Sequence, residues 1–309
     1  MGQPAYLKTY HSGLLAIKVE EVWSRMRDCR LCPRECGVDR TSGEVGFCKT
    51  GAQPWVSSAS PHFGEESPLV GRSGSGTIFM THCNLGCLIC QNEEISLQGR
   101  GREVSLDDLA TMMLDLQDQG CHNINFVTPT HAVAHILAAL PQAIEGGLKL
   151  PLVYNCGGYD HVETLKILEG VFDIYMPDFK FTDPEAARRI SNAPDYPQRA
   201  RAAITEMHRQ VGDLVLDEDG LAVRGLLVRH LVLPNRLAGS RRVFEFLAGM
   251  SKETYLNVMA QYRPCHLAYQ HKDLNRRLDP QEHAEAVEWA FQAGLTRLDE
   301  PRPRLFLRF

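Results

Sequence analysis

Cysteine spacing is the feature of this sequence that most limits what the chain can fold into. Seven of its ten cysteines fall in two short groups. The first group is Cys29, Cys32, Cys36 and Cys48, and the second is Cys83, Cys87 and Cys90. Cysteines in a reducing compartment seldom form disulfides, so grouped thiols of this kind indicate metal or redox chemistry. The other three, Cys121, Cys156 and Cys265, stand alone and are expected to be small, buried core residues.

The charge and hydropathy of the chain exclude several classes of protein. The 309 residues include 33 Lys and Arg against 38 Asp and Glu, a formal net charge of −5, which gives no electrostatic reason to expect nucleic acid as a partner. No stretch approaches the roughly 18 uninterrupted apolar residues of a membrane-spanning helix. Polar residues such as Lys8 and Lys18 interrupt the N-terminal segment, where a signal peptide needs an apolar run. We therefore expect a cytoplasmic protein that has no membrane partner.

Short apolar runs bounded by turn residues predict six strands, at Thr77–Thr81, Asn123–Val127, Leu152–Tyr154, Val171–Met176, Leu226–Leu233 and Tyr255–Met259. Helical patterns alternate with these runs. The clearest begins at Ser105, where Asp108 completes a capping box. A second helix is predicted to begin near Thr130, and a third to cover Glu282–Ala293. This alternation predicts an α/β fold with a parallel sheet. In such folds ligands bind at the carboxyl ends of the strands, so the residues just after each strand are the candidates for a site.

The N-terminal part of the chain differs from the rest. A helix is predicted from Leu14 to Met26, but residues 29–75 are rich in Gly, Pro, Ser and Cys and have little periodicity, which is typical of loops. We accordingly divide the chain into a Cys-rich, loop-dominated N-terminal extension (residues 1–72), a core (residues 73–265) and a C-terminal helix and tail (residues 266–309) that packs on the core.

The segment from Cys83 to Cys90 directly follows the first predicted strand, and we call it the three-cysteine loop. Three thiolates in so short a segment can bind one metal centre, and Gly86 can adopt backbone angles that other residues avoid. No fourth cysteine follows nearby, as it does in ferredoxins. One coordination position is therefore expected to stay open for a small molecule, as in a three-ligand catalytic zinc site. A zinc loop or a set of buried structural thiols is the alternative.

The Cys-x3-Cys-x2-Cys spacing after a strand resembles the cluster loop of the radical S-adenosylmethionine (SAM) superfamily. Further segments resemble its branch of pyruvate formate-lyase activating enzyme-like (PflX-like) proteins, namely Pro61–Glu66, Gly74–Phe79, Gln91–Asn92, Thr128–His131, Tyr154–Asn155, Asp178–Lys180, Arg229–Asn235 and Gln261–Pro264. The resemblance implies a partial (β/α)6 barrel of the TIM type, in which Cys83, Cys87 and Cys90 hold a [4Fe-4S] cluster whose remaining iron binds SAM. It also implies that one electron from the cluster cleaves SAM to methionine and a 5′-deoxyadenosyl radical, which abstracts a hydrogen atom.

The resemblance, together with the positions of polar residues on and after the predicted strands, suggests which side chains surround SAM. They are Thr128 and Thr130 for the ammonium group, Asn155 for the ribose or substrate, Lys180 beside Asp178 for the carboxylate, and Arg229 as a further carboxylate clamp. Superfamily members usually have a Gly-Gly-Glu-like segment where this chain has Thr128–His131, so the acidic member is missing here. The alternatives are a helix cap at Thr130 and a structural ion pair between Asp178 and Lys180. Because Arg229 and His230 are adjacent on one predicted strand, only one of them is expected to face the barrel interior.

The N-terminal group, Cys29-x2-Cys32-x3-Cys36-x11-Cys48, offers four soft ligands in a Gly- and Pro-rich segment. Four thiolates suit tetrahedral zinc or an iron–sulfur cluster. Either would stabilise a segment that has little apolar content. Activating enzymes often carry extra clusters, which favours an auxiliary [4Fe-4S] cluster. Their inserts usually follow the SAM cluster loop, however, so zinc stays open.

Three functional hypotheses follow. The leading one is a radical SAM enzyme that abstracts hydrogen from its substrate, with a glycyl-radical enzyme as the substrate and a flavodoxin- or ferredoxin-type protein as the reductant. The second keeps this chemistry but modifies a small molecule or a peptide. The third is an iron–sulfur electron-transfer or metal-binding protein without SAM turnover, which would require a four-ligand site at Cys83–Cys90.

Overall fold

Six parallel strands form the centre of the structure, a computed structural model that describes residues 2–299. In their order across the sheet they are β2 (Ser75–Met80), β4 (Ile124–Val127), β5 (Leu152–Cys156), β6 (Ile174–Pro177), β8 (Ala222–Leu231) and β9 (Tyr255–Met259). Each of them overlaps one of the predicted strands, which confirms the α/β fold. Among the strands of residues 2–299, β9 pairs with β8 and not with β2 at the other end of the parallel order, so the sheet forms a partial barrel that does not close.

The edge beyond β2 holds a strand that the sequence did not indicate. β1 (Trp55–His62) pairs antiparallel with β2, and β3 (Arg102–Glu103) pairs antiparallel with β1. The expectation of loops throughout residues 29–75 is therefore wrong for β1 and for the short helix α3 (Ser67–Val70). β1 contains three serines and a proline, so its extended conformation comes from pairing with β2 rather than from intrinsic β propensity. Through β1, the expected N-terminal extension contributes a strand to the sheet of the core.

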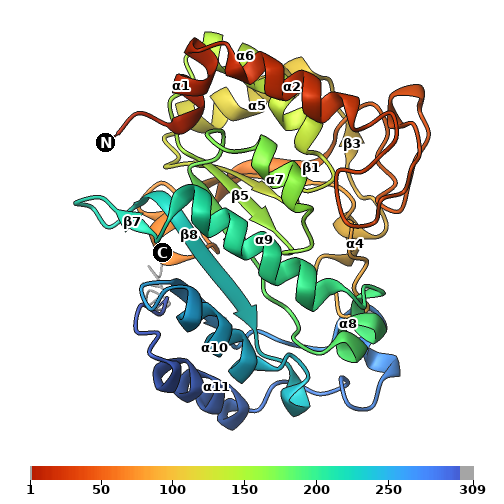
Figure 1. Cartoon of the computed structure of the whole chain (residues 1–309), viewed down its shortest axis with the longest axis vertical. Helices are drawn as coiled ribbons and strands as arrows, with labels where there is room; N and C mark the ends of the chain where they lie inside the picture. The colour runs from red at the N-terminus through yellow and green to blue at the C-terminus, as the bar shows by residue number, and fades with distance from the viewer. Residues whose placement is uncertain (1, 300–309) are drawn as a thin grey trace, which may run out of the picture.

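Helices follow most of the parallel strands and pack on the outer face of the sheet. They are α5 (Leu106–Asp118), α6 (Val133–Glu145), α7 (Val162–Ile167), α8 (Pro184–Ser191), α9 (Tyr196–Val211), α10 (Ser240–Met250) and α11 (Pro280–Ala293). Figure 1 shows α1 (Ala5–His11) and α2 (Leu14–Ser24), in red, at the opposite end of the molecule from α10 and α11, in blue; α2 packs against α6 and α7. α5 begins with the predicted capping box, in which the Ser105 and Asp108 side chains each accept a hydrogen bond from the other's backbone N–H. The remaining elements are short: α4 (Glu93–Ser96), β7 (Val215–Leu216) and three 3-10 turns, η1 (Arg40–Ser42), η2 (Pro234–Arg236) and η3 (His266–Gln270).

The parallel strands separate two apolar clusters, because successive side chains point to opposite faces of a sheet. Outward-facing residues such as Tyr154 and Val228 join the large core beneath the helices. Inward-facing residues form a smaller cluster inside the barrel, which consists of Leu69, Val153, Ile174, Met176, Leu214, Ala222 and Leu227. Leu69 comes from α3 and is completely buried, so α3 supplies part of the apolar floor of the barrel.

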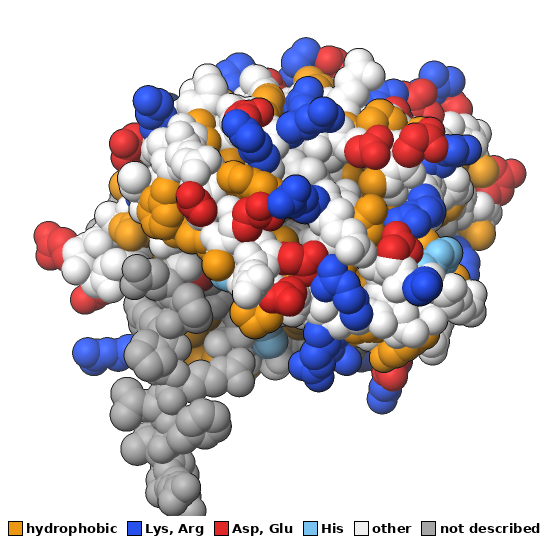
Figure 2. All heavy atoms as spheres, turned by 90° about the horizontal axis from the view of Figure 1, so that it is seen from below, with side chains coloured by type: hydrophobic (Ala, Val, Ile, Leu, Met, Phe, Trp, Pro, Cys, Tyr) orange, Lys and Arg blue, Asp and Glu red, His pale blue; other side chains and the backbone are white. Residues whose placement is uncertain are grey.

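The surface carries both signs of charge. Figure 2 views the molecule from the side of α10 and α11 and shows basic and acidic side chains interspersed over this face. Ion pairs account for part of this pattern, among them Arg236–Glu285, Arg241–Glu245 and Arg276–Glu282. Within the described residues, no helix combines the length and the apolar character needed to cross a bilayer.

Candidate functional site

The three-cysteine loop leaves the carboxyl end of β2 and is fixed by backbone contacts. Gly86 has φ of +67°, in the left-handed region, so another residue there would be strained. Leu88 donates its N–H to the carbonyl oxygen of Ile190 at 2.8 Å, and its own carbonyl accepts from the N–H of Leu267 at 3.0 Å. The loop is therefore held between α8 and η3.

Polar groups contact each of the three thiols. The Sγ of Cys87 lies 3.0 Å from the Oγ of Ser191, and the Sγ of Cys90 lies 2.9 Å from the Oγ of Ser96. The Sγ of Cys83 accepts a hydrogen bond from the N–H of Leu85 at 3.3 Å. Burial raises the pKa of Cys83 to about 12 and also raises that of Cys87. Burial thus disfavours the thiolate forms of Cys83 and Cys87, and a bound metal cation would favour them.

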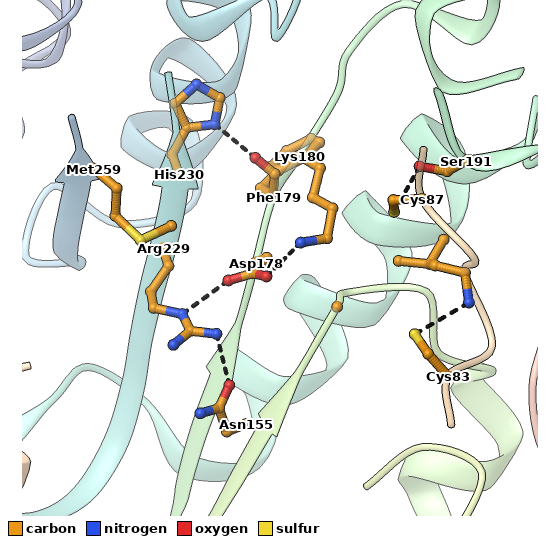
Figure 3. A network of polar contacts seen from close by, with 12 residues as sticks. Cys83, Cys87, Asn155, Asp178, Phe179, Lys180, Ser191, Arg229, His230 and Met259 are labelled. Atoms are coloured by element: carbon orange, nitrogen blue, oxygen red, sulfur yellow. Dashed lines mark hydrogen bonds and ion pairs between the residues drawn. The ribbon is translucent and has the colours of Figure 1, made fainter. Parts of the chain in front are cut away.

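Asp178 is the centre of a charged network at the carboxyl ends of β5, β6 and β8 (Figure 3). Its Oδ2 accepts from the Nζ of Lys180 at 2.6 Å, and its Oδ1 accepts from the Nε of Arg229 at 2.8 Å. The Nη2 of Arg229 donates to the Oδ1 of Asn155 at 2.6 Å. Four of the residues that were predicted to surround SAM are thus in contact with one another.

Two glutamates that the sequence analysis missed complete this network. The Oε2 of Glu65 lies 3.7 Å from the Nη1 of Arg229, and the Oε1 of Glu66 lies 3.9 Å from its Nε. Glu66 also accepts a hydrogen bond from the Nδ2 of Asn257 at 2.9 Å. Both glutamates lie between β1 and α3, in the segment Pro61–Glu66 that carried part of the family resemblance. The signal was therefore present in the sequence, but it indicated no role for these side chains.

The network holds carboxylates of two kinds. Burial raises the pKa of Glu66 to about 7 and raises the pKa of Glu65, although the positive charge of Arg229 acts in the opposite direction. Burial would also raise the pKa of Asp178, but Arg229 and Lys180 outweigh it and hold that pKa below its ordinary value. Asp178 is therefore held in its ionised form, whereas burial favours the protonated forms of Glu65 and Glu66.

Lys180 joins this network to the three-cysteine loop. Burial alone would lower the pKa of Lys180, but the negative charge of Asp178 and the sulfur of Cys87 raise it above the ordinary value. In Figure 3 the ammonium group of Lys180 lies between Asp178 and the segment that carries Cys87. A quarter of the Lys180 side chain is exposed, so a ligand at the loop can reach this cation.

The two threonines after β4 have different surroundings. Thr128 is half-buried and has φ of +61°, whereas Thr130 is fully buried and its Oγ1 donates to the Oδ1 of Asp160 at 2.8 Å. The hydroxyl of Tyr154 donates to the same oxygen at 2.8 Å. The helix-cap interpretation of Thr130 is wrong, because Ala132 occupies the N-cap position of α6. Asp160, which the sequence analysis also missed, brings an acidic group from the loop after β5 to the segment that lacks one.

The neighbouring predictions agree with the structure. Arg229 faces the barrel interior, and His230 faces the opposite side, with Nδ1 2.6 Å from the carbonyl oxygen of Phe179 and Nε2 2.9 Å from the Oγ of Ser240. The lone cysteines are buried, as expected for small core residues, and they are Cys121, Cys156 and Cys265.

The four N-terminal cysteines line one small cavity. Cys29, Cys32 and Cys48 are buried, and Cys36 is partly exposed and accepts a hydrogen bond from the N–H of Phe47 at 3.4 Å. Over residues 2–299, no three His, Cys, Asp or Glu side chains are arranged to hold a single metal ion. The fold gathers all four predicted ligands around one cavity, and that they bind a metal stays a prediction.

Sequence comparisons identify the family. A family model described as the radical SAM superfamily matches residues 77–218, which include the three-cysteine loop and, of the charged network, Asn155, Asp178 and Lys180. An uncharacterized protein of Methanocaldococcus jannaschii is 32% identical over 292 residues, which cover 91% of this chain and 80% of that protein. The chain belongs to the radical SAM superfamily.

Solved structures of other proteins resemble this radical SAM chain only distantly. A radical SAM methyltransferase from Sphaerobacter thermophilus superposes with a TM-score of 0.47 at 13% identity, over 74% of this chain and 67% of its own. Methylornithine synthase superposes with a TM-score of 0.45 at 15% identity, over 70% of this chain and 62% of its own. At these values the activities of the two proteins do not transfer to this chain.

Membership of the radical SAM superfamily implies a [4Fe-4S] cluster and SAM, and the residues of this chain fit both. Cys83, Cys87 and Cys90 are free thiols on one loop at the open end of the barrel. Three thiolates suit a cluster that keeps one iron available to a ligand. The charged network beside them offers cations and hydrogen-bonding groups for a zwitterionic amino acid.

Proposed function

We propose that this radical SAM protein reductively cleaves SAM at Cys83, Cys87 and Cys90 and uses the resulting radical to abstract hydrogen from a substrate. The observation that carries this proposal is the position of Lys180 between Asp178 and Cys87. When bound there, a [4Fe-4S] cluster supplies the electron that cleaves SAM and the iron that binds its amino acid end.

The side chains around the loop then divide the recognition of SAM. Lys180 provides a compact positive charge for the SAM carboxylate, and Asp178 orients that charge. Arg229 holds Asp178 and Asn155 in place, so it acts mainly as a support for these two residues. Backbone carbonyls near Thr128, with Asp160 beside them, provide acceptors for the SAM ammonium group.

The apolar floor of the barrel has a protective function in this scheme. Leu69, Val153, Met176 and Leu227 close the barrel below the charged network. Water is therefore excluded from below the network, which limits side reactions of a radical. Substrate enters from the opposite end, where the strands end at their carboxyl termini.

We further propose that the substrate is a glycine of a glycyl-radical enzyme, so that this protein acts as its activase, with a flavodoxin- or ferredoxin-type reductant. The support is the resemblance of Pro61–Glu66 and Asp178–Lys180 to segments of activating enzymes. The test is to incubate the reduced protein and SAM with a glycyl-radical enzyme encoded near its gene. An organic radical in the EPR spectrum that requires both proteins is expected, and its absence would restrict the substrate to other molecules.

The experiment that tests SAM cleavage compares two cysteine variants. Anaerobically reconstituted wild-type protein with SAM and dithionite is expected to release 5′-deoxyadenosine. Cys87→Ala should abolish this product and remove about four irons per chain, the content of one [4Fe-4S] cluster. Cys121→Ala is the matched control, because Cys121 is buried and stands apart from both cysteine groups. If Cys87→Ala keeps its iron and its product, the cluster site is misassigned.

A further inference from the structure

Arg40 is buried beside the four N-terminal cysteines. It begins η1, and only 1% of its surface is exposed. Its Nη1 lies 3.9 Å from the Sγ of Cys29, whereas its Nε and Nη2 have no hydrogen-bond partner among the described residues. Arg40 also lines the cavity that the four cysteines surround. A permanent positive charge is therefore held out of water next to four sulfur atoms.

No carboxylate compensates this charge. Over residues 2–299, Arg40 forms no ion pair with Asp or Glu, and Glu35, the one acidic residue that lines the cavity, is exposed and contacts His161 instead. A buried cation without an anion is strongly unfavourable. The sulfur atoms of the cysteines are the groups beside Arg40 that can carry negative charge.

A second polar atom is left without a partner at the same cavity. His131 follows β4 and is 1% exposed, and its Nε2 lies 2.8 Å from the carbonyl oxygen of Thr81. Its Nδ1 has no hydrogen-bond partner within the described part of the chain, although the residue lines the cavity. Two separate segments thus bring unsatisfied nitrogen atoms to the place where the four thiols gather.

We propose that Cys29, Cys32, Cys36 and Cys48 bind metal as thiolates and that Arg40 is the buried counter-cation of this centre. Four thiolates around either Zn²⁺ or a doubly charged iron–sulfur core leave a net double negative charge. Arg40 offsets half of that charge, with its Nη1 3.9 Å from the Sγ of Cys29 and its Nε and Nη2 still free to donate within the described residues. Arg40 is a positioning residue that stabilises the thiolates without binding the metal.

The first test is the metal content of the full-length protein, purified without oxygen. Wild-type protein is expected to carry more metal than Cys32→Ser, and iron is the metal expected for an auxiliary cluster. Zinc in place of iron would equally support the thiolate centre. Equal metal content in wild type and Cys32→Ser would overturn it.

The second test concerns Arg40 itself. Arg40→Met is expected to weaken metal retention against a chelator by about tenfold or more, the usual effect of losing an outer-shell partner. If the metal is a cluster, its midpoint potential should fall, because a nearby positive charge favours the reduced form. For both metal retention and midpoint potential, Arg40→Lys should lie between wild type and Arg40→Met. Arg30→Met is the matched control, since Arg30 is in the same segment but exposed and paired with Asp28.

A change of sign in thermal stability separates this role from simple packing. In wild-type protein, Arg40→Met should lower the melting temperature. In a chain with all four cysteines changed to serine, Arg40 has no anion, so Arg40→Met should raise the melting temperature. A decrease in both backgrounds, or metal retention equal to that of Arg30→Met, would overturn the assignment. If Arg40→Met does not fold in the wild-type chain, Arg40→Lys and the serine background decide the question.

Discussion

Arg34, which lies between Cys32 and Cys36 in the N-terminal cysteine group, donates from Nε to the carbonyl oxygen of Asn84 at 2.8 Å. Asn84 is the residue after Cys83. The Nη2 of Arg34 donates to the carbonyl oxygens of Leu85 and Ser191, at 3.1 and 3.0 Å. Its Nη1 donates to that of Asn192 at 2.6 Å. One side chain therefore ties the N-terminal cysteine segment to the three-cysteine loop and to the end of α8.

Arg34→Met should loosen the three-cysteine loop, because four carbonyl groups lose their donor. We expect the free energy of unfolding to fall by about 2–4 kcal/mol, since hydrogen bonds from charged donors are strong and unpaired carbonyls are costly. Iron should also be lost faster from the three-cysteine loop. Urea unfolding and the rate of iron release measure the two effects.

Arg30→Met serves as the control for Arg34→Met. Arg30 is exposed, and its only ion pair, with Asp28, is on the surface. We expect a change of less than about 1 kcal/mol in the control. Equal losses in the two variants would show that Arg34 does not support the loop.

The parallel sheet was predictable from sequence because its strands are buried on both faces. The run Ile174–Met176 is completely buried and apolar, and runs of this kind have few alternatives to a central strand. β1 was not predictable, since its serines and Pro61 give it the composition of a loop and its conformation depends on pairing with β2.

The candidate site was predictable only where the pairing of the parallel strands determines the position of a residue. Residues at the carboxyl ends of strands, such as Asn155 and Asp178, are placed by the parallel pairing itself, so their positions follow from the fold class. Glu65 and Glu66 reach Arg229 only because the segment after β1 turns toward the inner face of the barrel. A contact over such a sequence separation has no local pattern to reveal it.

Glu66 should make the stability of the protein depend on pH. The ordinary pKa of its carboxyl group is 4.5, and burial raises it to about 7 in the folded chain. Between these values the folded state binds more protons than the unfolded state, so the free energy of unfolding falls as pH rises, by as much as about 3 kcal/mol. Glu66→Gln keeps an acceptor for Asn257 and should reduce this fall.

Urea unfolding at pH near 5 and near 8 measures the effect for Glu66→Gln and for wild type. Glu20→Gln is the control, because Glu20 is exposed on α2 and should leave the pH dependence unchanged. If Glu66→Gln loses as much stability as wild type over this interval, then Glu66 does not titrate there.

Leu69→Ala should open the apolar floor of the barrel. Leu69 is completely buried and packs against inward-facing residues of β5, β6 and β8. Truncation of a buried leucine costs about 2–5 kcal/mol, depending on how far the cavity collapses. Leu14→Ala, at a position that is 50% exposed, should cost less than about 1 kcal/mol. Thermal or urea unfolding distinguishes the two, and a similar small loss for both would mean that α3 does not close the barrel.

Gly158→Ala should displace Asp178, because the two residues pack closely. Gly158 has φ of +74°, and a Cβ atom there would lie 2.2 Å from the carbonyl oxygen of Asp178 and 3.0 Å from the hydroxyl of Tyr196. Gly147→Ala is the matched control, since Gly147 also has a positive φ, of +95°, but has no atom within 4 Å of the added Cβ. Both variants should lose about 1–2 kcal/mol from backbone strain. Gly158→Ala alone should lose more than this and bind SAM more weakly, as measured by calorimetry on the reconstituted protein. Equal SAM affinity in the two variants would show that the position of Asp178 does not govern SAM binding.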